Sequence, residues 1–300
     1  MDFPDVVAAP MAGGPSTPEL VNAVTFGFLA LGTCTAEAAR AQLAAAQAPF
    51  GVNLFYPQPE PSLGDVRRTA ARFHADVPQV DVTSGFAAKF ALVLDAAPAV
   101  VSTTFGCFTQ QEISRLHACG SEAWVTVTNE FEAREAARRG ADGLIVQGPL
   151  AGGHRGTWDQ RDTPDERELG DLITAIVRKV DLPLIAAGGV RDAGGVDRLL
   201  ARGASSVACG SAFLLADEAG TSEQNRQLLK KGGISVSSRA FSGRFARGLE
   251  TPFVREHPDI PPIYPYLKPM LPDTPYCLVG ADFSGLAEGP ASDIERALTP

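Results

Sequence analysis

The sequence has few cysteines, and their spacing excludes two common kinds of structural support. None of the five belongs to a C-x-x-C pair, and they lie far apart, at Cys34, Cys107, Cys119, Cys209 and Cys277. Isolated cysteines in odd number indicate neither a disulfide framework nor a zinc site. No apolar run is long enough to cross a bilayer, and the N-terminus lacks the basic region of a signal peptide. We therefore expect a cytoplasmic protein with reduced thiols and no membrane partner.

Basic residues are outnumbered by acidic ones, and the formal net charge is -9. A general nucleic-acid binder needs a basic face, so the charge excludes that class of protein and still permits a local phosphate site. The sequence has no Walker loop, no G-x-G-x-x-G after a strand and no G-x-S-x-G elbow. Phosphate binding by a P-loop and hydrolysis by a serine triad are therefore unsupported.

What the sequence does contain is an alternation of short apolar runs with turns and helical patterns. With 45% hydrophobic residues the chain can bury a large core. Eight of the apolar runs are expected to be strands, at residues 6–10, 27–31, 50–55, 99–102, 123–128, 144–146, 182–187 and 206–209. This alternation favours an α/β fold, a (β/α)8 TIM barrel, with a doubly wound open sheet as the structural alternative.

The pattern changes after residue 215. Residues 237–248 are basic and contain glycine, and residues 257–275 are dense in proline and tyrosine. We expect residues 216–276 to form a small lid subdomain over the mouth of the barrel. Residues 1–215 and 277–300 then form the barrel domain.

The most informative stretch is residues 143–158. It opens as a buried strand and breaks into Gly152-Gly153-His154-Arg155-Gly156. Glycines are poor material for a strand interior, so we expect a loop that brings bare backbone close to a ligand. His154 is then a general base or a hydrogen-bond donor to a bound anion, and the alternative is a solvated surface turn. No second histidine or paired carboxylate lies nearby, so we expect no metal site.

Other candidate residues lie at predicted strand ends, where barrels build their active sites. Gly188-Gly189 and Gly210-Ser211 follow the seventh and eighth strands, where barrels commonly bind a phosphate. Asn53 and Gln147 are neutral amides that suit the edge of a flavin better than a metal. The alternative is that these groups only form turns and satisfy strand-end backbone.

Six motifs resemble those of the nitronate monooxygenase family, formerly called 2-nitropropane dioxygenase. They appear in family order as Ala9-Pro-Met-Ala-Gly-Gly14, Gly51-Val-Asn-Leu-Phe55, Val101-Ser-Thr-Thr-Phe-Gly106, the Gln147–Gly156 segment, Ala186-Ala-Gly-Gly189 and Arg239-Ala-Phe-Ser-Gly-Arg244. The resemblance implies a barrel that binds FMN at the strand ends and oxidises alkyl nitronates, with nitroalkanes as a further class. O2 re-oxidises the flavin, and the products are carbonyl compounds and nitrite.

The resemblance also assigns roles to matching positions. His154 matches the active-site histidine, which takes the α-proton of a nitroalkane or holds the nitro group of a nitronate. Residues matching flavin contacts are Met11, Asn53, Gln147, Gly152, Gly189, Ala208, Cys209, Gly210 and Ser211, with the phosphate at Gly189, Gly210 and Ser211.

Two departures from the family keep other readings open. Leu150 stands where the family usually has an acidic residue, and Cys209-Gly210-Ser211 replaces the usual Met-Gly-Thr. One alternative is an FMN-dependent enoyl-thioester (enoyl-ACP) reductase that uses NAD(P)H. Another is a catalytically altered flavin-barrel protein of a biosynthetic pathway. The sequence leaves open a homodimer. It also leaves open whether Arg239, Arg244 and Arg247 face the active site, face a subunit contact or form structural salt bridges.

Overall fold

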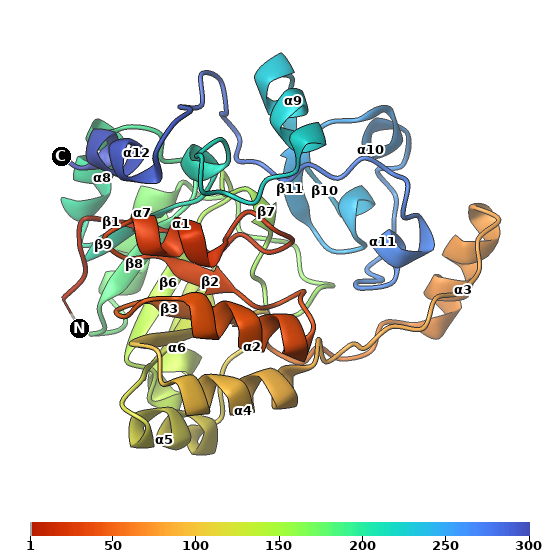
Figure 1. Ribbon diagram of the computed structural model, residues 1–300. Helices are drawn as coiled ribbons and strands as arrows, with labels where there is room; N and C mark the ends of the chain where they lie inside the picture. The colour runs from red at the N-terminus through yellow and green to blue at the C-terminus, as the bar shows by residue number, and fades with distance from the viewer. Residues whose placement is uncertain (1) are drawn as a thin grey trace.

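The computed structural model describes residues 2–300 and has an eight-stranded parallel sheet at its centre (Figure 1). The strands are β1 (Val6–Ala8), β2 (Phe28–Ala30), β3 (Gly51–Phe55), β4 (Val100–Thr104), β5 (Glu122–Val127), β6 (Gly143–Gln147), β8 (Leu184–Ala187) and β9 (Ser206–Cys209). Their order in the sheet is β1-β9-β8-β6-β5-β4-β3-β2. A parallel bridge between Ala8 and Gly27 joins the two ends of the sheet. The predicted (β/α)8 barrel is thereby confirmed.

The strands form where the sequence has its apolar runs, because almost every strand residue is buried. Parallel strands covered on both faces need such continuous apolar sequence. The register sets neighbouring strand ends side by side: Asn53 pairs with Ser102, and Gln147 pairs with Ala187. The carboxyl ends of all eight strands therefore open at one mouth.

Helices connect the strands and surround the barrel (Figure 1). They are α1 (Pro18–Ala23), α2 (Ala36–Ala45), α4 (Phe86–Ala96), α5 (Gln110–Ala118), α6 (Glu130–Arg139), α7 (Leu169–Val177), α8 (Ala193–Leu200) and the terminal α12 (Ala291–Leu298). Side chains of Thr17, Thr35, Thr109, Asn129 and Asp192 accept hydrogen bonds from the first turns of their helices. These caps explain why the helices begin where they do. Within residues 2–300 no helix combines the length and apolarity that a membrane span requires.

The segment after β9 builds a second, smaller layer over the barrel mouth. It begins with the 3-10 turn η1 (Ser211–Phe213) and continues with α9 (Glu223–Lys231), β10 (Ser235–Ser238), the 3-10 turn η2 (Arg239–Phe241), β11 (Ala246–Leu249), α10 (Pro252–Glu256) and α11 (Leu267–Met270). Figure 1 shows these elements together on one side of the barrel.

Two pieces of chain from outside residues 216–276 join that layer. Helix α3 (Leu63–Arg72) lies away from the barrel (Figure 1), and its Val66 and Ala70 share a hydrophobic cluster with Phe241 and Ile263. Strand β7 (Gly153–His154) pairs with β11 in the three-stranded sheet β10-β11-β7. The expectation of a plain loop around His154 is therefore wrong at these two residues, because pairing with a distant strand overrides the local glycine preference. The division of the chain at residues 216–276 stays a prediction.

Candidate active site

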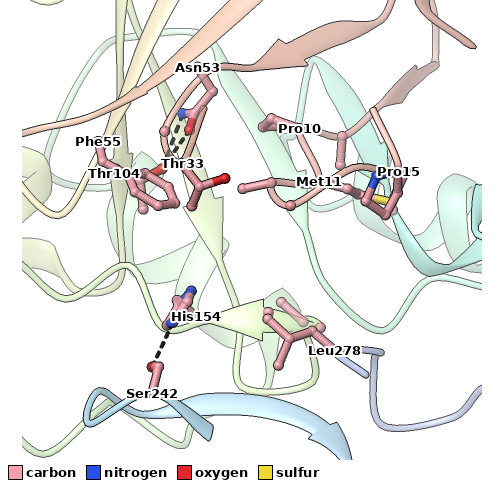
Figure 2. Close-up of a pocket in the computed structure, with 18 of the residues that line it drawn as sticks. Pro10, Met11, Pro15, Thr33, Asn53, Phe55, Thr104, His154, Ser242 and Leu278 are labelled. Atoms are coloured by element: carbon pink, nitrogen blue, oxygen red, sulfur yellow. Dashed lines mark hydrogen bonds between the residues drawn. The ribbon is translucent and has the colours of Figure 1, made fainter. Parts of the chain in front are cut away.

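A cavity of about 890 Å³ lies at the barrel mouth beneath the smaller layer. All ten residues that the sequence suggested for the site line it: Met11, Asn53, Gln147, Gly152, His154, Gly189, Ala208, Cys209, Gly210 and Ser211. They come from five strand ends and the β7 segment. Figure 2 shows His154 and Ser242 across the open space from Asn53 and Thr33. The fold thus collects positions that are spread over 200 residues of sequence.

One part of the cavity is lined by bare backbone after β8 and β9. Gly188 and Gly189 have φ angles of 123° and 77°, a region that side-chain-bearing residues rarely adopt. Within residues 2–300 the backbone N–H groups of Gly189, Gly210 and Ser211 donate no hydrogen bond. These free donors, beside glycines without side chains, form a cradle for an anion.

The C-terminal segment crosses directly over this cradle. The hydroxyl of Ser211 accepts a hydrogen bond from the N–H of Gly280 at 2.8 Å. A Cβ atom at Gly152 would come within 2.6 Å of the backbone nitrogen of Gly280. Glycine at 152 is therefore required by close packing of two backbones. The packing of the fold alone therefore accounts for glycine at this position of the motif.

Asn53 is 3% exposed, and its side chain is held by the neighbouring strand β4. Its Nδ2 group donates to the hydroxyls of Ser102 at 2.9 Å and Thr104 at 3.1 Å. The contact of its Oδ1 with Thr104 is long, at 3.4 Å. The amide is thus fixed through its nitrogen, which leaves the oxygen available to accept a hydrogen bond from a ligand.

Gln147 at the end of β6 binds the histidine segment instead of projecting freely. Its Nε2 donates to the carbonyl of His154 at 2.9 Å, and its Oε1 accepts from the N–H of Gly156 at 2.8 Å. Arg155, 1% exposed, donates to the carbonyls of Gln147 and Gly148 from the same segment. Gln147 lines the cavity and at the same time sets the path of the chain around His154.

His154 presents one ring nitrogen to the lid and the other to the cavity. Its Nε2 lies 2.7 Å from the hydroxyl oxygen of Ser242 (Figure 2). Nδ1 makes no hydrogen bond with residues 2–300. The rings of Phe55, Phe105 and Tyr264 meet the imidazole edge-to-face, at centroid distances of 6.4, 5.8 and 5.2 Å. These contacts fix the plane of the ring.

The surroundings keep this imidazole neutral at physiological pH. Burial, and secondarily the charge of Arg244, lower the pKa of His154 to about 3. A neutral ring has one donor and one acceptor nitrogen. If Ser242 donates to Nε2, Nδ1 carries the proton and donates to an anion; if Ser242 accepts, Nδ1 is a base. Both roles that the sequence suggested are therefore compatible with the geometry.

The low pKa of His154 makes stability depend on pH. A histidine in the unfolded chain titrates near pH 6.5, so below that pH the unfolded chain binds a proton that folded His154 does not. The free energy of unfolding then falls by up to ~1.4 kcal/mol per pH unit from this group as pH drops from 6.5 towards 3. We expect His154→Asn to show a shallower fall between pH 6.5 and 4.5 in urea unfolding. Equal slopes for the two proteins would contradict the neutral assignment.

Several residues around His154 were not identified from the sequence. Ser242 and Tyr264 come from the lid, and only the pairing of β7 with β11 brings them to the barrel. The suggested salt-bridge role of three arginines is wrong: within residues 2–300, Arg239, Arg244 and Arg247 donate to backbone carbonyls and, for Arg244, to neutral side chains. None of the three lies within salt-bridge distance of a described carboxylate.

The described chain offers no candidate metal centre. Within residues 2–300 no three His, Cys, Asp or Glu side chains gather as metal ligands would. His74, His117 and His257 do not line the cavity. Thr128, a strand-end residue, binds the buried carboxylate of Glu132 and likewise lies outside it.

Comparison with known proteins agrees with this geometry. A family model described as nitronate monooxygenase matches residues 3–270. The nitronate monooxygenase of Pseudomonas aeruginosa is 32% identical over 87% of this chain and 82% of its own length. That of Paraburkholderia phytofirmans is 31% identical over 83% of this chain and 74% of its own length.

Solved structures agree as well. A nitroalkane oxidase from Streptomyces ansochromogenes superposes with a TM-score of 0.89 and 34% identity, over 98% of this chain and 94% of that one. FabK from Thermotoga maritima, at 21% identity and a TM-score of 0.75 over 98% and 91% of the two chains, shares the fold. The chain is an oxidoreductase, and it belongs to the nitronate monooxygenase family.

Proposed function

We propose that the protein binds FMN and oxidises alkyl nitronates with O2 to carbonyl compounds and nitrite. The observation that carries this proposal is the placement of Nδ1 of a neutral His154 in a cavity that also contains a cradle of free backbone N–H groups. The cradle suits a phosphate, and the imidazole suits an anionic or weakly acidic substrate.

The residues present fit the phosphate of FMN. Free N–H donors at Gly189, Gly210 and Ser211 would hold the phosphate oxygens, as glycine-rich loops commonly do. The hydroxyl of Ser211 accepts from Gly280, so its own hydrogen is free to donate to the same group. The replacement of the usual threonine by Ser211 thus keeps the hydroxyl.

The flavin ring would lie between the barrel floor and His154. Oδ1 of Asn53 would accept from a ring N–H, and Met11 would pack against the ring. Bound FMN supplies a two-electron acceptor beside the substrate. His154 would hold a nitro oxygen through Nδ1–H, or take the α-proton of a nitroalkane at the same atom. Phe55, Phe105 and Tyr264 would keep water from the imidazole.

Three further expectations remain proposals. We propose that residues 216–276 act as the lid that sets substrate access, since they supply Tyr264 and Ser242 to the cavity. A homodimer and a cytoplasmic location are compatible with the sequence. Leu150 is 47% exposed and does not line the cavity, so its departure from the family leaves the proposed chemistry in place.

Steady-state turnover tests the proposal and separates it from enoyl-thioester reduction. FMN-loaded protein would be mixed in air with propyl-2-nitronate, with 2-nitropropane, or with NADPH and crotonyl thioester. We expect nitronate to cause O2 consumption and nitrite release. NADPH oxidation that depends on the thioester, without nitrite from the nitronate, would favour the reductase and overturn the proposal.

A further inference from the structure

Arg244 is a fully buried cation that meets only neutral acceptors. Its side chain is 1% exposed. Nε donates to the carbonyl of Arg155 at 3.2 Å, and Nη1 donates to Oε1 of Gln58 at 2.8 Å. Nη2 donates to the carbonyl and the hydroxyl of Thr157. Buried guanidinium groups usually face carboxylates, so this arrangement leaves a charge that the surrounding residues do not neutralise.

The charge persists at neutral pH. Burial lowers the pKa of Arg244 to about 10, well above 7. Glu132 and Asp159 act on it only from a distance: Glu132 accepts hydrogen bonds from Thr128 and Trp158, and Asp159 pairs with Arg161. Arg244 therefore contributes a fixed positive potential at the back of the active site.

Arg244 adjoins the surroundings of His154 through two contacts, one from its backbone and one from its guanidinium. The backbone N–H of Arg244 reaches the hydroxyl of Ser242 at 3.4 Å, the same hydroxyl that meets Nε2 of His154. The guanidinium carbon also lies 4.0 Å from the ring centroid of Phe105, whose other contacts include the imidazole. Arg244 itself does not line the cavity.

The other groups packed around the imidazole carry no competing charge. They are the rings of Phe55, Phe105 and Tyr264 and the hydroxyl of Ser242. Tyr264 is the titratable one among them, and burial raises its pKa to about 12. Arg239 meets Ser242 through its backbone carbonyl, and its guanidinium lies over the ring of Phe245. Arg244 is thus the charged group that lowers the pKa of His154.

We propose that Arg244 is a positioning residue whose buried charge opposes protonation of His154 beyond the effect of burial, and so makes the site select substrates that already carry a negative charge. A nitroalkane must give a proton to His154, which places an imidazolium beside the buried guanidinium. A nitronate needs no such proton transfer and is attracted by the same charge. This inference rests on the proposed function for the substrate, but its effect on His154 can be measured without turnover.

The first test is a histidine titration by NMR, with Arg244→Gln, Arg244→Lys and the control Arg239→Met. The protein has four histidines, so the spectrum of ¹⁵N-histidine-labelled protein is simple, and His154→Asn assigns the signal. At pH 4 a pKa of about 3 leaves roughly a tenth of wild-type His154 protonated. We expect about half or more in Arg244→Gln, because the midpoint rises by about one pH unit. Arg244→Lys, which keeps the charge, and Arg239→Met should resemble wild type.

An unchanged His154 midpoint in Arg244→Gln would overturn the proposal. Circular dichroism identifies the pH range in which each protein stays folded. Should Arg244→Gln not fold, the lysine variant still decides, because a raised midpoint with the charge retained would contradict the electrostatic role.

The second test is substrate selection. The ratio of kcat/KM for 2-nitropropane to that for propyl-2-nitronate should rise about tenfold in Arg244→Gln and stay near wild type in Arg244→Lys. If Arg244→Gln shifts the titration midpoint of His154 but leaves the kcat/KM ratio unchanged, the proposed selection of anionic substrates is wrong. Wild-type protein that turns over neither compound would contradict the proposed function, and the titration would still decide the role of Arg244 towards His154.

Discussion

His154→Asn is expected to lower kcat/KM for alkyl nitronates by ~10²–10³-fold, since an active-site donor to an oxyanion typically has an effect of this size. Turnover of neutral nitroalkanes should fall by ~10²–10⁴-fold, the usual contribution of a general base. Asparagine removes Nδ1 from the cavity and cannot take a proton. The measurement is steady-state nitrite release with both substrates on FMN-loaded protein.

The comparison of the two substrates identifies the role of His154. An equal loss for both indicates that the ring holds the nitro group, whereas a larger loss for nitroalkanes indicates a base. The visible flavin spectrum should be retained, because the free N–H groups of the cradle are untouched. His117→Asn is the matched control, since His117 lies on the surface and contacts Asp142. Unchanged turnover of both substrates in His154→Asn would show that His154 takes no part in the reaction.

Gly210→Ala is expected to weaken FMN binding at least tenfold, or about 1.4 kcal/mol, without unfolding the protein. A Cβ atom at this position would meet Ala9 at 3.5 Å and Met11 at 3.6 Å, which are ordinary contacts. The chain therefore has room for the methyl group. The methyl would nevertheless stand beside the free N–H groups that we assign to the phosphate. Fluorescence titration of apoprotein with FMN measures the change.

The control for this variant is Gly194→Ala, in helix α8 and outside the cavity. It should bind FMN as wild type does, because its Cβ would project towards Asp192 and Arg198. Thermal unfolding of both apoproteins checks that the folds are intact. Equal FMN affinity in Gly210→Ala and wild type would contradict phosphate binding at the end of β9.

Most of the barrel could be predicted because short stretches of sequence indicate its strands and the first residues of its helices. The barrel strands are short, mostly apolar runs, and the capped helices around the barrel begin at a threonine, asparagine or aspartate. The strand ends of a barrel meet at one mouth whatever lies between them. Asn53, Gln147 and Gly210 could therefore be placed in one cavity before any coordinates were known.

The lid side of the site depends on contacts that no local pattern encodes. Residues Gly153 and His154 become a strand because β11, some 90 residues later, supplies its partner. Helix α3 has an ordinary amphipathic pattern, but the pattern does not say that its partner is the lid. Arg244 is the last residue of a recognised motif, but its lack of a carboxylate partner becomes evident only in the fold, where Gln58 and Thr157 surround it.

Anaerobic mixing of the FMN-loaded protein with propyl-2-nitronate tests electron transfer from the nitronate to the flavin. We expect the visible flavin absorbance to bleach within the turnover time, as electrons pass from the nitronate to the flavin. His154→Asn should bleach much more slowly, and NADPH should have little effect on the wild type. A flavin spectrum that persists with the nitronate and bleaches with NADPH would contradict the account.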